Sequence, residues 1–267
     1  MRIESLWIER YKNLEDFAFT TAAGLTTVLI GPNGTGKSNF IEAVIWIFRN
    51  LDLDEPPQFT YKISYTCRGR KIRVDGKRKL SEEERSKRRE LEITVDEKVI
   101  SVTEFKRRKD ELMPTNVFAY YSGSSTRLEL LFNQHFQNYY TATLKERDMP
   151  LRRLFYCHLA HGNFALLGFY AKDDKEDQKF LLEHLGIEGI ESVLFVLRHP
   201  WWFKGKPNSQ QLKEGDSRFW YAAGLVKNFA SRLWEHTLPP IRDEGDETLD
   251  FRGKKERKEW CSFGKRA

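Results

Sequence analysis

The feature that most constrains this chain is a glycine-rich turn between two apolar segments of different periodicity. The turn, Gly31–Gly36, follows Thr26–Ile30, a short β-branched run of the kind found in buried parallel strands. Lys37–Arg49 comes next and has apolar residues at helical spacing, at Phe40, Ile41, Val44, Ile45 and Phe48. A buried strand, a tight turn and an amphipathic helix in this order predict an α/β fold.

The turn also carries a phosphate-binding pattern. It matches G-x-x-x-x-G-K-[ST] without a mismatch and consists of Gly31, Pro32, Asn33, Gly34, Thr35, Gly36, Lys37 and Ser38. Glycines let the backbone bring its N–H groups close to an anion, and the helix N-terminus adds partial positive charge. We therefore predict a P-loop that binds ATP with Mg²⁺. Lys37, the catalytic candidate, is expected on the β- and γ-phosphates and Ser38 on the metal.

The sequence around this loop resembles that of ABC-type ATPases of the SMC/RecF/OLD group. Their loop reads G-x-N-G-x-G-K-S-[TN] and runs into an L/I-[LI]-[ED]-A-like helix; here Asn39 ends the loop and Phe40–Ala43 follows. Leu6–Leu14 is similar to the opening strand of the group, with two substitutions. The resemblance implies that Asn39 belongs to the nucleotide site and that Lys12 lies near the phosphates.

The resemblance also implies a fold and a function. The fold would be a P-loop NTPase, an ABC-ATPase-like head, with an antiparallel β insertion and a helical region. Such heads bind ATP in DNA repair or phage defence, with DNA and a nuclease as partners. They pair head to head, each lending a signature serine to the other's nucleotide. The chain would be the N-terminal half of a restriction- or defence-associated AAA family ATPase.

The acidic motif that hydrolysis needs in this group is not found. It is an apolar strand ending in Asp-Glu, whereas Val193–Leu197 ends in Arg198. Leu51–Glu55 carries acids but follows a helix, which favours a solvated loop. Asn116–Tyr121 occupies the place of the group's Q-loop strand without a Gln, and Ser122–Ser124 is too short for a signature motif. We expect the chain to bind ATP and to hydrolyse it poorly.

Composition changes along the chain predict three regions. Residues 1–125 would form the P-loop lobe, with a β insertion at about 60–110 in which Asp75-Gly76 marks a hairpin. Residues 126–240 are expected to be mostly helical, and 241–267 to be a loose, charged tail. Within the helical region, helices are expected over 127–140, 150–170, 176–185 and 216–238, and a β-like run over 192–197.

Three other features could carry a function, and each also has a structural explanation. Arg68–Asp110 holds sixteen Lys/Arg against ten Asp/Glu, which suits a DNA-backbone patch or a solvated hairpin. Cys157, His158 and His161 could share a metal, although helix packing explains them as well. His199–Phe203 could stack on bases or anchor a local core.

Composition excludes several classes of protein. The chain has 267 residues, of which 40% are hydrophobic, and a formal net charge of +6. Its three cysteines are far apart, which argues against a disulfide framework or a four-ligand zinc site. No apolar run approaches the ~20 residues of a membrane span, so we expect a cytoplasmic protein. The alternatives to an ATPase head are a P-loop small-molecule kinase and a non-hydrolysing, nucleotide-dependent interaction module.

Overall fold

The computed structural model describes residues 1–21, 24, 26–78, 90–123, 125–144, 152–172, 174–198, 200, 203, 205–237, 241–243 and 258–264. The chain divides into two compact units, which are treated separately below. The first unit combines Met1–Phe136 with Arg152–Cys157, and the second combines Gln137–Leu151 with His158–Ala267. This division differs from the predicted boundaries at residues 125 and 240.

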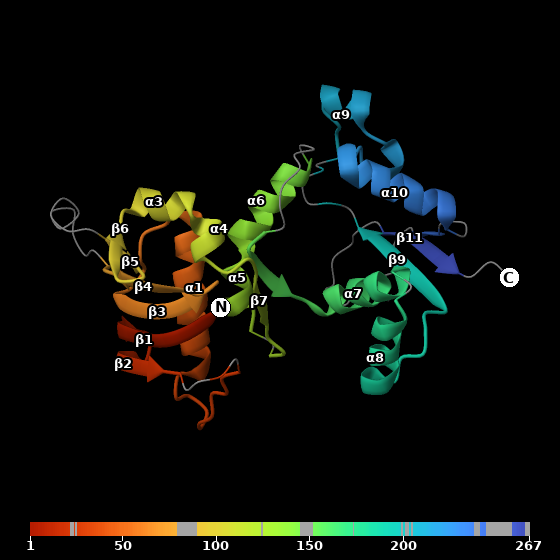
Figure 1. Cartoon of the computed structure of the whole chain (residues 1–267). Coiled ribbons are helices and arrows are strands. Elements are labelled where there is room, and N and C mark those ends of the chain that lie inside the picture. Colours follow the sequence, from red (N-terminus) through yellow and green to blue (C-terminus); the bar gives the residue numbers. More distant parts are fainter. Residues whose placement is uncertain are drawn as a thin grey trace. The chain divides into compact units, whose positions relative to one another are not determined.

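A six-stranded antiparallel sheet forms most of the first unit (Figure 1). Its strand order is β2-β1-β3-β4-β5-β6, so the predicted β insertion and the N-terminal hairpin build one continuous sheet. One face is buried and one is solvated, which explains the alternating burial along β3 and β4. The strands are β1 (Arg2–Tyr11), β2 (Leu14–Thr20), β3 (Tyr61–Cys67), β4 (Arg70–Gly76), β5 (Leu91–Val95) and β6 (Lys98–Ile100).

Helix α1 (Lys37–Leu53) covers the buried face of this sheet (Figure 1). Its residues Ala43, Ile47, Phe48 and Leu51 belong to the same buried cluster as the inward residues of the strands. The Phe48 ring meets Tyr65 of β3 edge-on at a centroid distance of 5.3 Å. Truncation of such a buried aromatic side chain to alanine costs about 3–5 kcal/mol, so this contact is a main attachment of the helix.

The hairpin turns are not where the sequence predicts them. The turns between β3 and β4, at residues 68–69, and between β5 and β6, at residues 96–97, have positive φ at both central positions. That is the geometry of two-residue type I′ turns. Asp75-Gly76, the predicted hairpin, lies inside β4 instead. Glycine is needed there because a Cβ at Gly76 would lie 2.5 Å from the Tyr61 ring.

The predicted buried strand before the P-loop is wrong for this structure. Thr26–Ile30 has no regular secondary structure, and the side chains of Val28 and Ile30 are 72% and 90% exposed. Only Leu29 packs partly against the core. A strand exists through hydrogen bonds to a neighbouring strand, and no described strand pairs with this segment. Its β-branched composition is therefore not enough to make it a strand.

Short elements complete the first unit. Strands β7 (Val117–Tyr120) and β8 (Leu154–Cys157) pair in parallel, which confirms the predicted strand at 116–121. The helix predicted over 150–170 is wrong in its first part, because β8 alternates buried and half-buried large residues as a strand does. A second buried cluster joins these strands to α1 through Ile45. Besides α1, the described helices of the first unit are α3 (Val102–Arg107), α4 (Lys109–Leu112), α5 (Arg127–Leu130) and the start of α6 (Asn133–Leu144), which from Gln137 onward belongs to the second unit.

The second unit contains helices and a three-stranded antiparallel sheet of order β10-β11-β9. Helix α8 and strand β9 confirm the elements predicted at 176–185 and 192–197. The Asp174 carboxylate caps α8, since it accepts hydrogen bonds from the backbone N–H groups of Glu176 and Asp177. The elements are α7 (Leu159–Ala171), α8 (Lys175–Leu185), β9 (Ser192–Arg198), α9 (Ser209–Glu214), α10 (Gly224–His236), β10 (Ile241–Asp243) and β11 (Lys258–Gly264).

Two expectations for this unit differ from the structure. The helix predicted over 216–238 is divided, because Trp220 and Tyr221 have φ values of 53° and 59°. A 3-10 turn, Ser217–Phe219, precedes this break and α10 follows it. Where the sequence predicts no regular structure, Ile241–Asp243 and Lys258–Gly264 are strands, because they find pairing partners in each other and in β9.

Candidate functional site

The glycine-rich turn forms an exposed loop at the N-terminus of α1. Gly34 and Gly36 have φ values of 86° and 99°, a conformation that side chains with a Cβ rarely adopt. Gly36 is the N-cap of α1, and no side chain caps the helix. The backbone N–H groups of the first helical turn therefore face the loop, in the arrangement that binds anions.

The side chains of the turn are arranged around the same loop. Lys37 donates from Nζ to the backbone carbonyls of Gly31 and Pro32, at 2.6 Å each, so its ammonium group lies across the turn. Thr35 Oγ1 also donates to the Pro32 carbonyl, at 2.9 Å. Among the described residues, none hydrogen-bonds the Ser38 hydroxyl, which leaves it available to a ligand.

The turn between β1 and β2 supports the loop from one side. Asn13 donates from Nδ2 to the Gly34 carbonyl at 2.9 Å, and its Oδ1 accepts from Asn39 Nδ2 at 2.6 Å. Gly36 has to be a glycine for a second reason, because a Cβ there would lie 2.8 Å from Leu14 Cδ2. The structure thus places Asn39, which the sequence assigns to the site, in contact with a residue that it does not assign.

A buried carboxylate lies one helical turn beyond Ser38. The side chain of Glu42 is 6% exposed, and Lys12 Nζ lies 2.6 Å and 2.7 Å from its two oxygens. Arg127 Nε lies 3.2 Å from Oε2 of the same carboxylate, and its guanidinium also donates to Asn39 Oδ1 at 2.8 Å. Burial, and then a hydrogen bond to Glu42, holds the pKa of Tyr11 above its ordinary value.

Sequence reasoning missed Asn13, Glu42 and Arg127 as parts of this site. Glu42 falls within the quoted helix motif, but its spacing from Ser38 is the only signal that it shares a helix face with the loop. Arg127 is 88 residues from Asn39 in the chain and could not be assigned from spacing. The β1–β2 turn brings Lys12 close to the loop, where its ammonium group forms an ion pair with Glu42.

The donor groups around the turn fit a nucleoside triphosphate with its metal ion. Open backbone N–H groups at the helix N-terminus and the Lys37 ammonium suit phosphate oxygens, which are anionic acceptors. A hydroxyl at the first turn of the helix, Ser38, is a ligand of the type that Mg²⁺ uses beside a phosphate. When bound, the metal ion would neutralise charge on the phosphates, and these residues would hold and orient them.

The acids considered for hydrolysis lie at the wrong end of α1. Asp54 pairs with Lys109 at 2.8 Å, and Glu55 pairs with Arg49. Both follow the C-terminus of a 17-residue helix, about 25 Å from the P-loop at its N-terminus. Neither carboxylate can therefore polarise a water at the phosphates.

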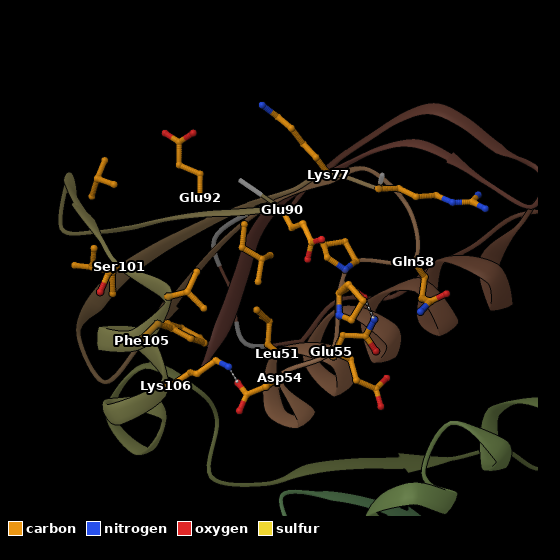
Figure 2. Close-up of a pocket in the computed structure, with 18 residues that line it drawn as sticks. Leu51, Asp54, Glu55, Gln58, Lys77, Glu90, Glu92, Ser101, Phe105 and Lys106 are labelled. Carbon is orange, nitrogen blue, oxygen red and sulfur yellow. Dashed lines mark hydrogen bonds and ion pairs between the residues drawn. The ribbon is translucent and has the colours of Figure 1, made fainter. Parts of the chain in front are cut away.

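A separate cavity of about 920 Å³ opens at that C-terminal end (Figure 2). Figure 2 shows an apolar floor that includes Leu51 and Phe105, with Lys77, Glu90 and Glu92 around it. The rim also carries the Asp54–Lys106 ion pair, at 3.6 Å. Its charges are mixed in sign, unlike those of a phosphate site, so the cavity does not compete with the P-loop as the candidate nucleotide site.

The other sequence candidates receive less support. Arg70 and Arg73 of the basic region pair with Asp96 and Asp75, at 2.8 Å and 3.0 Å, and residues 79–89 lie outside the described residues. His161 Nδ1 accepts from the His158 backbone N–H at the start of α7. No three His, Cys, Asp or Glu side chains of the described chain could hold a metal ion together.

Two further sequence expectations concern the aromatic segment and the membrane. Most of His199–Phe203 lies outside the described residues, so the stacking hypothesis stays a prediction. None of the described helices is both long and apolar enough to span a membrane.

Comparison with known proteins gives a family match and a similar solved structure. A family model described as the AAA ATPase domain matches residues 1–185, which include the six-stranded sheet, α1 and the P-loop. The chain is also similar to a solved structure of the recombination mediator protein RecF–ATP in the RecFOR pathway. The identity is 14% over 88% of this chain and 67% of that chain, with a TM-score of 0.30. Comparison with curated proteins gave no match.

Proposed function

Because this chain belongs to the AAA ATPase domain family, we propose that residues 31–38 bind ATP together with Mg²⁺. Lys37 supplies the cation for the β- and γ-phosphates, and Ser38 supplies the hydroxyl ligand of the metal ion. Asn39 and Lys12 complete the site, the former on the first turn of α1 and the latter on the adjacent β1–β2 turn. The chain acts as an ATPase head of the SMC/RecF/OLD type.

One observation carries this proposal. The N-terminus of α1 has no side-chain cap, and the loop before it turns on two glycines with positive φ while Lys37 lies across it. A helix end left without a cap leaves up to four N–H groups unpaired, which costs free energy unless water or a ligand satisfies them. An anion of the size of a triphosphate satisfies several of them at once.

Calorimetric titration of the whole chain with ATP and Mg²⁺ tests the site. Lys37→Ala should lose most of the affinity, because the phosphates lose their only loop cation, whereas Ser38→Ala should lose mainly the Mg²⁺-dependent part. Lys98→Ala is the matched control, since Lys98 is an exposed lysine on β6 outside the loop. Unchanged ATP binding by Lys37→Ala would refute the assignment.

The wider biological role is proposed from the same family type. We infer that nucleotide binding is coupled to a DNA transaction in repair or phage defence, with a nuclease as partner and head-to-head pairing of two copies. Lys71 supports a contact with DNA, because it is an exposed cation of β4 on the sheet face away from α1. The neighbouring Arg70 and Arg73 are already paired with acids, so the expected DNA affinity is modest.

A further inference from the structure

Glu42 has more compensating charge than a carboxylate requires. Its side chain is almost fully buried, and both Lys12 and Arg127 lie within ion-pair distance of it. One cation is enough to balance a buried carboxylate, and a carboxylate left without any is strongly unfavourable. One of the two cations can therefore leave Glu42 without stranding a buried charge, as long as the other stays.

The two cations differ in how firmly they are held. Arg127 uses its planar guanidinium on two partners, Glu42 and Asn39, and the next residue, Leu128, is 3% exposed in a hydrophobic cluster. The Lys12 ammonium contacts Glu42 and lies 5.5 Å from the centroid of the Tyr11 ring. A lysine is a point charge on a flexible stem, whereas an arginine fork is fixed by its geometry. Lys12 is therefore the exchangeable cation.

Lys12 is also kept close to the P-loop. Its neighbour Asn13 donates to the Gly34 carbonyl, so the β1–β2 turn is fastened to the loop. Lys12 itself has a φ of 54° as the first residue of the two-residue turn between Tyr11 and Leu14, so the geometry of the hairpin fixes the position of its backbone beside the loop.

We propose that Arg127 is a positioning residue of the nucleotide site, an inference that rests on the proposed ATP site. Without nucleotide, Lys12 lies on Glu42. When phosphates add negative charge at the loop, Lys12 leaves Glu42 for them, and Arg127 remains to neutralise the carboxylate. Arg127 thus raises ATP affinity without touching ATP, because it removes the cost of releasing Lys12.

The experiment is calorimetric titration of the whole chain with ATP and Mg²⁺. Arg127→Gln should weaken binding about tenfold, because Lys12 is then held by an otherwise uncompensated Glu42. Adding Glu42→Gln should restore most of that loss, since the neutral amide no longer holds Lys12. Arg127→Lys should lose less affinity than Arg127→Gln, because the charge at Glu42 is kept although the second contact, to Asn39, is lost. Lys12→Gln should weaken the wild type more than it weakens Arg127→Gln.

The added substitution Glu42→Gln separates this positioning role of Arg127 from a purely structural one. Arg127→Gln also loses the hydrogen bond to Asn39, but Glu42→Gln cannot restore that bond. Failure of Glu42→Gln to rescue binding, or equal and additive losses from Lys12→Gln in both backgrounds, would overturn the inference. Wild-type protein that does not bind ATP would instead defeat the proposed site itself. Wild-type binding with no effect of Arg127→Gln would defeat only the role of Arg127.

Discussion

Replacement of Asp52 by asparagine should destabilise the first unit in a way that depends on pH. Asp52 lies in the last turn of α1, and its oxygens lie 2.8 Å from His135 Nε2 and 2.8 Å from Arg153 Nε. His135 is on α6 and Arg153 directly precedes β8, so this one carboxylate links three elements far apart in the chain. Arg153 also pairs with Asp110, whose side chain is fully exposed.

The size of the effect follows from burial. Removing one partner of a buried ion pair costs about 3–5 kcal/mol. Asp52 keeps 17% of its side-chain exposure, and Arg153 retains a hydrogen bond to the Pro114 carbonyl, so the lower end, about 3 kcal/mol, is expected for Asp52→Asn. Asp110→Asn is the matched control on the same guanidinium and should cost only about 0–1 kcal/mol, as exposed pairs do.

The pH dependence of this effect has a definite sign. Burial alone would raise the pKa of Asp52, but hydrogen bonds from His135 and Arg153 outweigh it and lower the pKa below its ordinary value of 3.8. A carboxylate with a lowered pKa stabilises the folded state fully above its unfolded pKa. That contribution is lost as the pH falls through the pKa of Asp52 in the folded state. The difference in free energy of unfolding between the wild type and Asp52→Asn should therefore disappear below about pH 3.8.

Urea unfolding at a series of pH values between 7 and 3 measures this gap, with tryptophan fluorescence as the signal. The free energy of unfolding of Asp52→Asn should be lower than that of the wild type at pH 7 and should approach it at acid pH. A difference that is the same at every pH would refute the electrostatic reasoning. An equal loss in Asp110→Asn would show that the exposed pair, rather than the buried one, fixes Arg153.

Two further predictions concern turnover and DNA. The purified chain should bind ATP but hydrolyse it very slowly. Glu55→Gln should leave the hydrolysis rate unchanged, because Glu55 pairs with Arg49 at the opposite end of α1 from the P-loop. Rapid, Lys37-dependent phosphate release that Glu55→Gln abolishes would contradict this prediction. The logarithm of the DNA association constant should fall linearly with the logarithm of the salt concentration, with a slope of about −0.9 per phosphate contact, and Lys71→Glu should reduce that slope. A filter-binding or anisotropy titration that detects no DNA binding at low salt would favour a solvated hairpin.

Local patterns predicted the elements whose partners are close in the chain. The P-loop pattern and the apolar spacing after it predicted α1, and the region predicted as a β insertion, at about 60–110, contains β3 to β6. These elements are formed by local propensity together with a face that has to be buried. The strand at 154–157 was missed for the opposite reason, because its partner, β7, precedes it by more than thirty residues. Its sequence is equally compatible with a buried helix segment.

The site was predictable as far as its backbone pattern and no further. The motif predicts the roles of Lys37 and Ser38 because each role is tied to a fixed place in the turn. Arg127 has no such place: it reaches Glu42 only because α5 is packed against α1 through Leu128 and Ile45. Side chains that act through tertiary packing carry no local sequence signal. A sequence can therefore predict the phosphate-binding loop but not the distant residues that support it.

The support of the P-loop is unequal on its two sides, and this gives Lys37 a second role. The C-terminal half of the turn is fastened by Asn13 and packed against Leu14, whereas the preceding segment, Thr26–Ile30, is exposed apart from Leu29 and pairs with none of the described strands. The start of the turn is held by the two hydrogen bonds from Lys37 to the Gly31 and Pro32 carbonyls. In the proposed ATP site, Lys37 would exchange these bonds for phosphate oxygens, which would free the Gly31 carbonyl and leave the Pro32 carbonyl to Thr35 Oγ1. The triphosphate would then order the loop by accepting hydrogen bonds from its backbone N–H groups, which ties the order of the loop to the presence of the nucleotide.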